Sequence, residues 1–241
     1  MKPGCTADSF FNGRLRICQM QDGYRFSIDA VLLADFCRPR PQDRILDIGA
    51  GCGIISLLLA WRHPGIRLVG VEAQAELAEL AVFNVRQNRM EDRIAIANKD
   101  IKDFRPSGGE GLFDGIVSNP PYRRAFSGRI NPDRQKALAR HEILLTLDSL
   151  LDRVRALLKT AGWFALVYPA ERAAELLESM RRVNIEPKRL RPVYSTMESP
   201  ARLVLVGGVK AGRPGLNIEP PLVIYGNDGR YTGELAAMMM N

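Results

Sequence analysis

The stretch RILDIGAGCGI, residues 44–54, decides the fold predicted for this chain. Residues 45–48, Ile-Leu-Asp-Ile, form a short, mainly apolar run that is typical of a buried parallel strand. Glycines spaced as G-x-G-x-G follow at once, and an apolar run of helical length, 54–62, comes after them. A strand that enters a glycine-rich turn and then a helix is the opening unit of a doubly wound sheet, in which ligands bind outside the carboxyl ends of the strands.

The rest of the chain continues this alternation of strand and helix. With the first strand at 45–48, six further strands are predicted at 68–71, 94–97, 113–117, 163–168, 190–194 and 203–206. Helices are predicted between them at 54–62, 75–87, 142–158 and 170–182. Such alternation predicts an α/β fold: a doubly wound, mostly parallel seven-stranded sheet with helices on both faces.

The segments outside this alternation divide the single predicted domain, 1–241, into three parts. Residues 1–41 form a short N-terminal lid segment with a strand at 14–18 and an apolar helix at 28–36, entered from Ser27 as its N-cap. Residues 42–209 form the core. Residues 210–241 form a C-terminal extension, predicted as a β-ribbon with turns at Gly207-Gly208 and at 226–229, a strand at 222–225 and a frayed end at 238–241.

Composition excludes several classes of function. The 241 residues contain no apolar stretch of about twenty residues and no signal-peptide core, so we expect a cytoplasmic protein without a membrane partner. Four cysteines without a C-x-x-C pair, and only two histidines, predict neither structural zinc nor a disulfide framework. The net charge of +7 favours a polyanionic partner such as nucleic acid.

The glycine-rich turn fits one of two nucleotide ligands better than the other. A dinucleotide fingerprint needs a third glycine in the spacing G-x-G-x-x-G, and Ile54 stands at that position here. Asp47, two residues before Gly49, would repel a pyrophosphate, but its carboxylate suits a cationic amino-acid group. These residues favour S-adenosylmethionine, whose ammonium and sulfonium groups are positively charged.

Two further carboxylates follow the next two strands. Glu72 is placed to accept hydrogen bonds from the ribose hydroxyls. Asp100 could accept from an adenine amino group, while Ile101 offers its backbone N–H to the ring. Either carboxylate alone is typical of a solvated strand end. Their order after Asp47 and the glycines makes the whole set much more specific for a cofactor site than any one residue. The predicted cofactor residues of the turn and of these strand ends are Asp47, Gly49, Ala50, Gly51, Gly53, Glu72, Asp100 and Ile101.

The stretch SNPPY, residues 118–122, ends the strand predicted at 113–117. Neither proline donates a backbone hydrogen bond, and Pro120 keeps Asn119 out of the helical region. The stretch is therefore a stiff, extended corner at the carboxyl end of a strand. It presents an amide, carbonyl groups and the ring of Tyr122 to the predicted cofactor site.

With these motifs the chain resembles the class I methyltransferases, which have a Rossmann-like fold, and Asn119-Pro120-Pro121-Tyr122 matches the N-P-P-Y motif of their amino-group methyltransferases. The flanking stretches GYRFSIDAVLLA, 23–34, and ARHE, 139–142, are similar to the bacterial tRNA(valine) adenine-N6 methyltransferases. The resemblance covers nearly the whole chain. It implies methyl transfer from S-adenosylmethionine to the N6 amine of an anticodon-loop adenine.

The resemblance also implies roles for the residues at this corner. The Asn119 side-chain oxygen and the Pro120 carbonyl would accept from the two N–H groups of the target amine, and Pro121 and Tyr122 complete the catalytic motif, with Tyr122 stacked on the flipped base. Asn119 also borders the cofactor. Independently of the resemblance, residues 24–26 and Ser27 are predicted to form a lid over the methionine end of the cofactor, while core packing explains Phe26 equally well. Basic residues after the motif are also typical of a solvated surface, and their position beside the predicted active site favours contacts with RNA phosphates: Arg123, Arg124, Arg129 and Arg140.

Several other functions share these motifs. A protein glutamine methyltransferase acting on release factors would share the N-P-P-Y motif, because a glutamine amide is an equally poor nucleophile. Such enzymes have a long N-terminal helical domain, whereas only about forty residues precede the first core strand here. Guanine-N2 methylation of rRNA uses related motifs, commonly with phenylalanine in place of Tyr122. A DNA adenine methyltransferase usually carries a large target-recognition domain. A non-catalytic RNA-binding protein that keeps the fold is the alternative outside enzymes.

Overall fold

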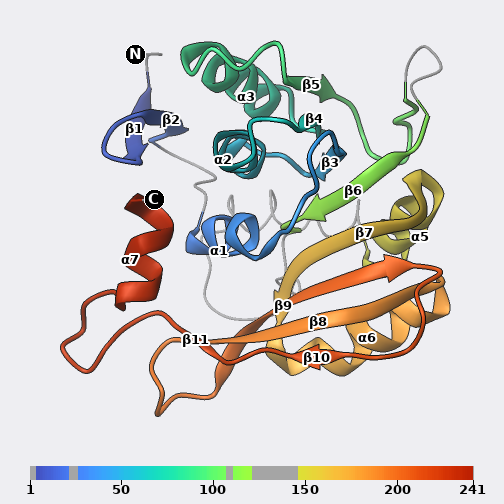
Figure 1. The fold of residues 1–241 in the computed structure, drawn as a ribbon. Helices are drawn as coiled ribbons and strands as arrows, with labels where there is room; N and C mark the ends of the chain where they lie inside the picture. Colours follow the sequence, from blue (N-terminus) through green and yellow to red (C-terminus); the bar gives the residue numbers. More distant parts are fainter. Residues whose placement is uncertain (1–3, 22–26, 107–110, 121–145, 241) are drawn as a thin grey trace, which may run out of the picture.

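A nine-stranded sheet forms the centre of the computed structural model, which describes residues 4–21, 27–106, 111–120 and 146–240 (Figure 1). Its seven principal strands lie in the order β8, β9, β7, β6, β3, β4, β5. Their bounds are β3 Arg44–Ile48, β4 Arg67–Glu72, β5 Ile94–Asn98, β6 Phe113–Ser118, β7 Leu158–Pro169, β8 Ile185–Tyr194 and β9 Ala201–Lys210. Only β9 runs antiparallel to its neighbours among these seven strands. The predicted mostly parallel seven-stranded sheet is confirmed.

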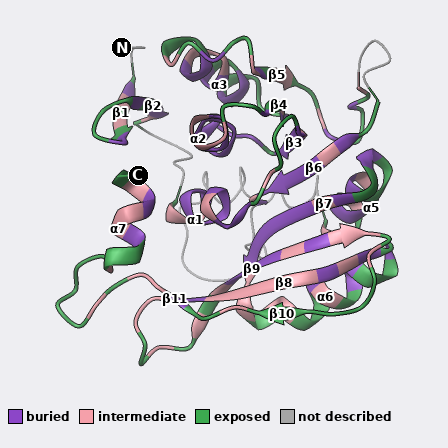
Figure 2. Ribbon diagram, in the orientation of Figure 1, coloured by how far each residue is buried: buried purple, intermediate pink, exposed green. Residues whose placement is uncertain are grey.

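Helices cover both faces of the sheet because its strands are apolar on both sides. Ile45 of β3 packs into the cluster on one face, whereas its neighbour Leu46 packs into the cluster on the other. The first cluster contains side chains of α1, α2, α3 and α7, and the second those of α5 and α6, so buried residues follow the sheet between two helical layers (Figure 2). The helices are α1 Ile28–Phe36, α2 Ile54–Arg62, α3 Ala75–Gln87, α5 Leu147–Leu157, α6 Ala173–Arg182 and α7 Gly233–Met240.

The predicted helices agree closely with these bounds. The helices α1, α2 and α3 have the predicted limits. Thr146 caps α5, since its side chain accepts from the Ser149 N–H at 3.2 Å, and residues 142–145 of that prediction lie outside the described residues. The helix predicted at 170–182 begins as a 3-10 turn, Ala170–Arg172, before α6.

The N-terminal segment forms a β-hairpin of which the sequence predicts only the second strand. In it, β1 Cys5–Phe10 pairs antiparallel with β2 Leu15–Met20. The first strand was missed because its polar residues give no apolar run. The hairpin packs on α3, where Asn88 accepts the Arg16 N–H at 2.9 Å.

Two predictions for the C-terminal segment are wrong. Gly207 and Gly208 lie inside β9 instead of forming a turn. A Cβ on Gly208 would stand 2.5 Å from Met180 Cε, so this glycine allows α6 to approach the sheet closely. In place of a separate ribbon, β10 Asn217–Ile218 and β11 Leu222–Val223 each pair in parallel with β8 and extend the sheet. The predicted turn at 226–229 is confirmed, since the Gly226 N–H bonds to the Arg230 carbonyl at 2.9 Å.

The predicted frayed end at 238–241 is also wrong for the residues that the structure describes. The helix α7 buries Leu235 completely and Met238 almost completely against α1. The Met239 carbonyl accepts the Phe11 N–H at 3.0 Å, and Arg62 donates to the Met238 carbonyl. The apolar side chains of a short terminal helix thus complete the core. None of the helices in the described part of the chain is long and apolar enough to cross a membrane.

Candidate functional site

Asp47 lies near the carboxyl end of β3 and is completely buried. Its Oδ2 accepts a hydrogen bond from the Ser56 hydroxyl at 2.7 Å, while Oδ1 has no hydrogen-bond partner among the described residues. Burial, with a smaller contribution from the nearby charge of Glu72, raises the pKa of Asp47 to about 6, while the hydrogen bonds from Ser56 act in the opposite direction. A buried carboxylate oxygen without a donor is poised to accept from a cationic ligand group.

The glycine-rich turn after β3 takes a backbone path that suits glycine. Gly49, Gly51 and Gly53 have φ angles of 73°, 56° and 85°. The turn is anchored to β4, since the N–H groups of Gly49 and Ala50 donate to the Val71 carbonyl at 2.9 and 3.1 Å. A Cβ on Gly49 would have no described atom within 4 Å, so this part of the turn faces open space that a ligand can fill.

Glu72 joins the end of β4 to this turn across 21 residues of sequence. Its Oε2 accepts the Gly51 N–H at 2.9 Å, and its Oε1 accepts the Gln74 N–H at 2.9 Å. The side chain is buried and fixed in direction by both bonds. Each carboxylate oxygen keeps a lone pair that a ligand hydroxyl could use. The structure therefore brings Asp47, the glycine turn and Glu72 together, as the sequence predicts.

Asp100 and Ile101 follow the next strand along the same edge. The Glu72 carbonyl accepts the Lys99 N–H at 3.0 Å, which holds the ends of β4 and β5 together. Asp100 Oδ1 accepts the Lys102 N–H at 2.9 Å and shapes the turn in which Ile101 is buried. These two residues thus border the Glu72 end of the site, while their contact with an adenine ring stays a prediction.

Arg153 of α5 fixes this turn from the other face, and the sequence reading missed it. Its Nε donates to the Ile101 carbonyl at 3.0 Å, and one terminal nitrogen donates to the Phe104 carbonyl at 2.8 Å. Because Arg153 is 52 residues away from Ile101, no local pattern in the sequence indicates this contact.

Asn119 and Pro120 continue β6, which lies beside β3. Ser118 is in register with Ile48, and its hydroxyl donates to the Ile48 carbonyl at 2.9 Å. Asn119 therefore follows a residue bonded directly to the one before Gly49. Asn119 is half-buried and Pro120 is buried. The corner predicted to hold a substrate amine thus begins next to the glycine turn.

Other predicted site residues lie outside the described residues. These are Pro121 and Tyr122 of the motif, residues 24–26 of the predicted lid, and Arg123, Arg124, Arg129 and Arg140. Their roles stay predictions.

Ser27 occupies the N-cap position of α1, but its side chain makes no capping hydrogen bond. Ser27 is exposed, and its side chain bonds to the Asp29 carboxylate instead. Burial raises the pKa of Asp29, and the bond from Ser27 offsets part of this rise. The predicted N-cap position is confirmed, although no side-chain capping bond forms there. Since no described contact joins Ser27 to the carboxylates of the site, its cofactor role stays a prediction.

Asn84 of α3 is a second supporting residue that the sequence reading missed. It is completely buried, and its Nδ2 donates to the carbonyls of Cys18 and Cys52, both at 2.9 Å. Its Oδ1 accepts the Cys18 N–H at 2.8 Å. One amide thereby ties the N-terminal hairpin to the glycine turn. The sequence signal that could have indicated this role is an asparagine on the apolar face of a helix, where its neighbours include Ala81 and Val85.

The fold and the site define a class I S-adenosylmethionine-dependent methyltransferase. Residues 26–168 match the model of the methyltransferase small domain, and the chain belongs to this family. A protein of Porphyromonas gingivalis named tRNA1(Val) (adenine(37)-N6)-methyltransferase is 38% identical over 204 residues, which cover 76% of this chain and 79% of that protein. One of the same name from Dyadobacter fermentans is 30% identical over 212 residues, covering 88% and 86%.

Solved structures share the fold at lower identity. The crystal structure of a predicted O-methyltransferase from Agrobacterium tumefaciens matches with a TM-score of 0.69 at 20% identity and covers 87% of this chain and 94% of that one. At this identity the match shows the fold alone.

S-adenosylmethionine is the cofactor, and the residues at the sheet edge fit it. Oδ1 of Asp47, which has no hydrogen-bond partner in the described part of the chain, suits the ammonium group. The open side of Gly49 admits close approach, and the fixed Glu72 carboxylate suits the ribose hydroxyls. In the part of the chain that the structure describes, no three His, Cys, Asp or Glu residues are grouped to hold a metal.

Proposed function

We propose that this enzyme methylates the N6 amine of an adenine in tRNA, and that its target is the anticodon-loop adenine of a valine tRNA. The observation that carries the proposal is the position of the Asn119-Pro120 corner directly beside the glycine turn, fixed by the Ser118 bond to Ile48. Two relatives that match at least three quarters of this chain carry the name of that activity.

The chemistry of the corner fits an amine on a planar ring. The lone pair of such an amine is delocalised, and bound S-adenosylmethionine supplies an electrophilic methyl group that the nitrogen must attack. The Asn119 side-chain oxygen and the Pro120 carbonyl would accept from the two N–H groups, which favours a tetrahedral nitrogen and stabilises its growing positive charge. Proximity and alignment supply the rest of the catalysis. No general base is needed, because the nitrogen can lose a proton after transfer.

The substrate side of the proposal rests on the relatives and on sequence. A base inside a helix cannot reach the corner, so the adenine must be unstacked, as a loop nucleotide of a folded RNA can be. We propose Tyr122 as the stacking residue, and Arg123, Arg124, Arg129 and Arg140 as phosphate contacts. We also retain residues 1–41 as a lid segment, 42–209 as the core and 210–241 as an extension of a single domain. We propose a cytoplasmic location, which fits a tRNA substrate.

A methyl-transfer assay separates this activity from its alternatives. The protein is incubated with tritiated S-adenosylmethionine and, separately, with tRNA, rRNA, DNA and a release factor. We expect label in tRNA, and digestion followed by mass spectrometry should give N6-methyladenosine. Label in protein alone would instead identify a glutamine methyltransferase, and N2-methylguanosine in rRNA would identify the guanine activity. No transfer to any substrate, together with no measurable cofactor binding, would leave a non-catalytic RNA-binding protein.

The substitution Asn119→Ala tests the role of the corner. Removal of one preorganised hydrogen-bonding group from such a site reduces turnover by about 10²- to 10³-fold. We expect that loss in kcat, with the dissociation constant for S-adenosylmethionine close to that of the wild type. Asn217→Ala, at an exposed position of β10, is the matched control and should keep full activity. Equal loss of cofactor affinity and turnover in Asn119→Ala would show that Asn119 acts on the fold or on the cofactor instead.

A further inference from the structure

Two tyrosines of the C-terminal segment form a stacked pair on the surface. The rings of Tyr225 and Tyr231 have centroids 5.4 Å apart and planes inclined by 25°. The side chains are 39% and 47% exposed. An aromatic ring usually gains by burial, so an ordered, exposed pair indicates a surface that receives a ligand.

The turn between the two tyrosines holds the pair in place. Tyr225 and Tyr231 are bridge partners across it. The Gly229 N–H donates to the Gly226 carbonyl at 3.0 Å, and the Thr232 N–H donates to the Ile224 carbonyl at 3.0 Å. The rings are thus presented by a braced hairpin.

The pair lies at the same edge of the sheet as the catalytic corner. β9 is antiparallel to both β7 and β8, so β8 runs in the direction of β7 and β6. Tyr225 follows the end of β8, since its N–H donates to the Ser195 carbonyl at 2.9 Å. From β6 to β11 there are four steps across the sheet, about 19 Å at about 4.8 Å a step. The pair is therefore too far from Asn119 to hold the target base and is placed for another part of the same substrate.

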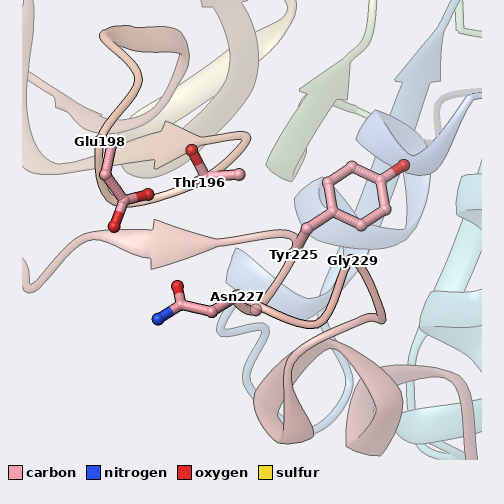
Figure 3. Close-up of a pocket in the computed structure, with 6 residues that line it drawn as sticks. Thr196, Glu198, Tyr225, Asn227 and Gly229 are labelled. Carbon is pink, nitrogen blue, oxygen red and sulfur yellow. The ribbon is translucent and has the colours of Figure 1, made fainter.

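The surroundings of Tyr225 have the chemistry of a nucleobase site. An open depression beside it is lined by the β8–β9 connection and by the turn, which contribute Thr196, Glu198, Gly226, Asn227 and Gly229 (Figure 3). Glu198 offers a hydrogen-bond acceptor, and Asn227 offers both donor and acceptor. Figure 3 shows the Tyr225 ring directed away from both side chains, so these polar groups are placed for a nucleotide next to the stacked base. Because the carboxylate of Glu198 disfavours an RNA phosphate at this place, the RNA would contact the tyrosine rings through the face of a base.

We propose that Tyr225 and Tyr231 form a stacking platform for an unpaired nucleobase of the RNA substrate, several nucleotides from the methylated adenine. The proposal rests on the proposed function. It gives the C-terminal segment a part in substrate binding that the motifs of the core do not supply. Aromatic platforms bind bases with little preference for sequence, because every base has a π-face. The platform would hence add affinity for RNA, while the corner selects the amine.

The test measures RNA affinity by fluorescence anisotropy with two probes: a transcript of a valine tRNA and a single-stranded RNA of mixed sequence. Loss of one stacked base weakens binding by roughly 5- to 150-fold. We expect this loss for Tyr225→Ala and Tyr231→Ala with both probes. Tyr225→Phe keeps the ring and should bind as the wild type does. Ile218→Ala, which removes another exposed apolar side chain (67% exposed) on β10, is the matched control and should have no effect.

Two further measurements keep the proposal open to refutation. If the alanine variants fail to fold, RNA containing 4-thiouridine is cross-linked to the wild-type protein by light and mapped by mass spectrometry, and an adduct at Tyr225 or Tyr231 supports the platform. Wild-type affinity in both alanine variants, or the absence of any such adduct, would overturn it. If the wild type methylates no tRNA but Tyr225→Ala still loses affinity for single-stranded RNA, the platform stands and the proposed substrate falls.

Discussion

The substitution Asp47→Asn should favour the stability of the cofactor-free protein more at pH 7.5 than at pH 5, and it should weaken cofactor binding. Asp47 is completely buried, and only one of its carboxylate oxygens has a hydrogen-bond partner among the described residues. The asparagine side chain has the same shape and can still accept the hydrogen bond from Ser56, but it carries no charge. The two effects have opposite signs because the charge is unfavourable for the empty site and favourable for a cationic ligand.

The size of the first effect follows from the pKa of Asp47. Burial raises this pKa from 3.8 to about 6, so the folded chain binds more protons than the unfolded chain between these values, and its stability falls as the pH rises. At pH 7.5 the shift of about 2 units corresponds to roughly 3 kcal/mol of lost stability. At pH 5 the loss of stability is about half as large. The advantage of Asp47→Asn over the wild type should thus shrink by about 1.4 kcal/mol between pH 7.5 and pH 5.

Urea unfolding of both proteins without cofactor, at pH 7.5 and at pH 5, measures this difference. The unpaired amide of the variant lowers its stability by about 1–3 kcal/mol at either pH, so it cancels from the comparison. Calorimetry at pH 7.5 gives the second effect. A hydrogen bond to a charged group contributes about 1.5–3 kcal/mol, so S-adenosylmethionine should bind roughly 10- to 100-fold more weakly.

Asp43→Asn is the matched control, because Asp43 is a buried acid before the other end of β3 and bonds to Trp163 Nε1 at 2.8 Å. It should leave cofactor affinity unchanged. A stability difference between Asp47→Asn and the wild type that does not change with pH would refute the raised pKa. Unchanged cofactor affinity in Asp47→Asn would refute the assignment of Asp47 to the ammonium group.

Two further substitutions test contacts that support the glycine turn and the interior of the sheet. Asn84→Ala leaves the Cys18 N–H and the Cys18 and Cys52 carbonyls without their Asn84 partner. At about 1–3 kcal/mol for each group, the substitution should lower the free energy of urea unfolding by about 3 kcal/mol or more, and a loss below about 1 kcal/mol would show that Asn84 does not support the turn. Gly115→Ala puts a Cβ 2.2 Å from the Trp163 ring, and should destabilise by about 1–3 kcal/mol with a shift in tryptophan fluorescence; wild-type stability and emission would show that the ring has room to move.

The order of strands and the core of the site could be predicted because their signals are local. Apolar runs mark the strands, and three glycines with a preceding acid mark the turn where parallel strands end. Glu72 and Asn119 then follow by position alone, as carboxyl ends of neighbouring strands. The supporting residues could not be predicted in this way. Arg153 and Asn84 act on carbonyls 52 and 66 residues away, and such contacts depend on how helices pack.

The errors at the two chain ends have a common physical cause. The strand Cys5–Phe10 and the helix Gly233–Met240 carry weak patterns of their own, since each is stabilised by what it packs against. The Phe11 N–H donates to the Met239 carbonyl, so the two ends support each other.

The packing of these ends bears on function, because the hairpin is also bonded through Asn84 to the Cys52 carbonyl in the glycine turn. The C-terminal segment crosses from β8 past Tyr225 and Tyr231 to α7, which packs on α1 and bonds to the hairpin. One continuous set of contacts thus runs from the proposed RNA platform to the cofactor turn. Residues outside the motifs would in that case set the geometry of both binding sites, and loss of α7 should disturb RNA and cofactor binding together.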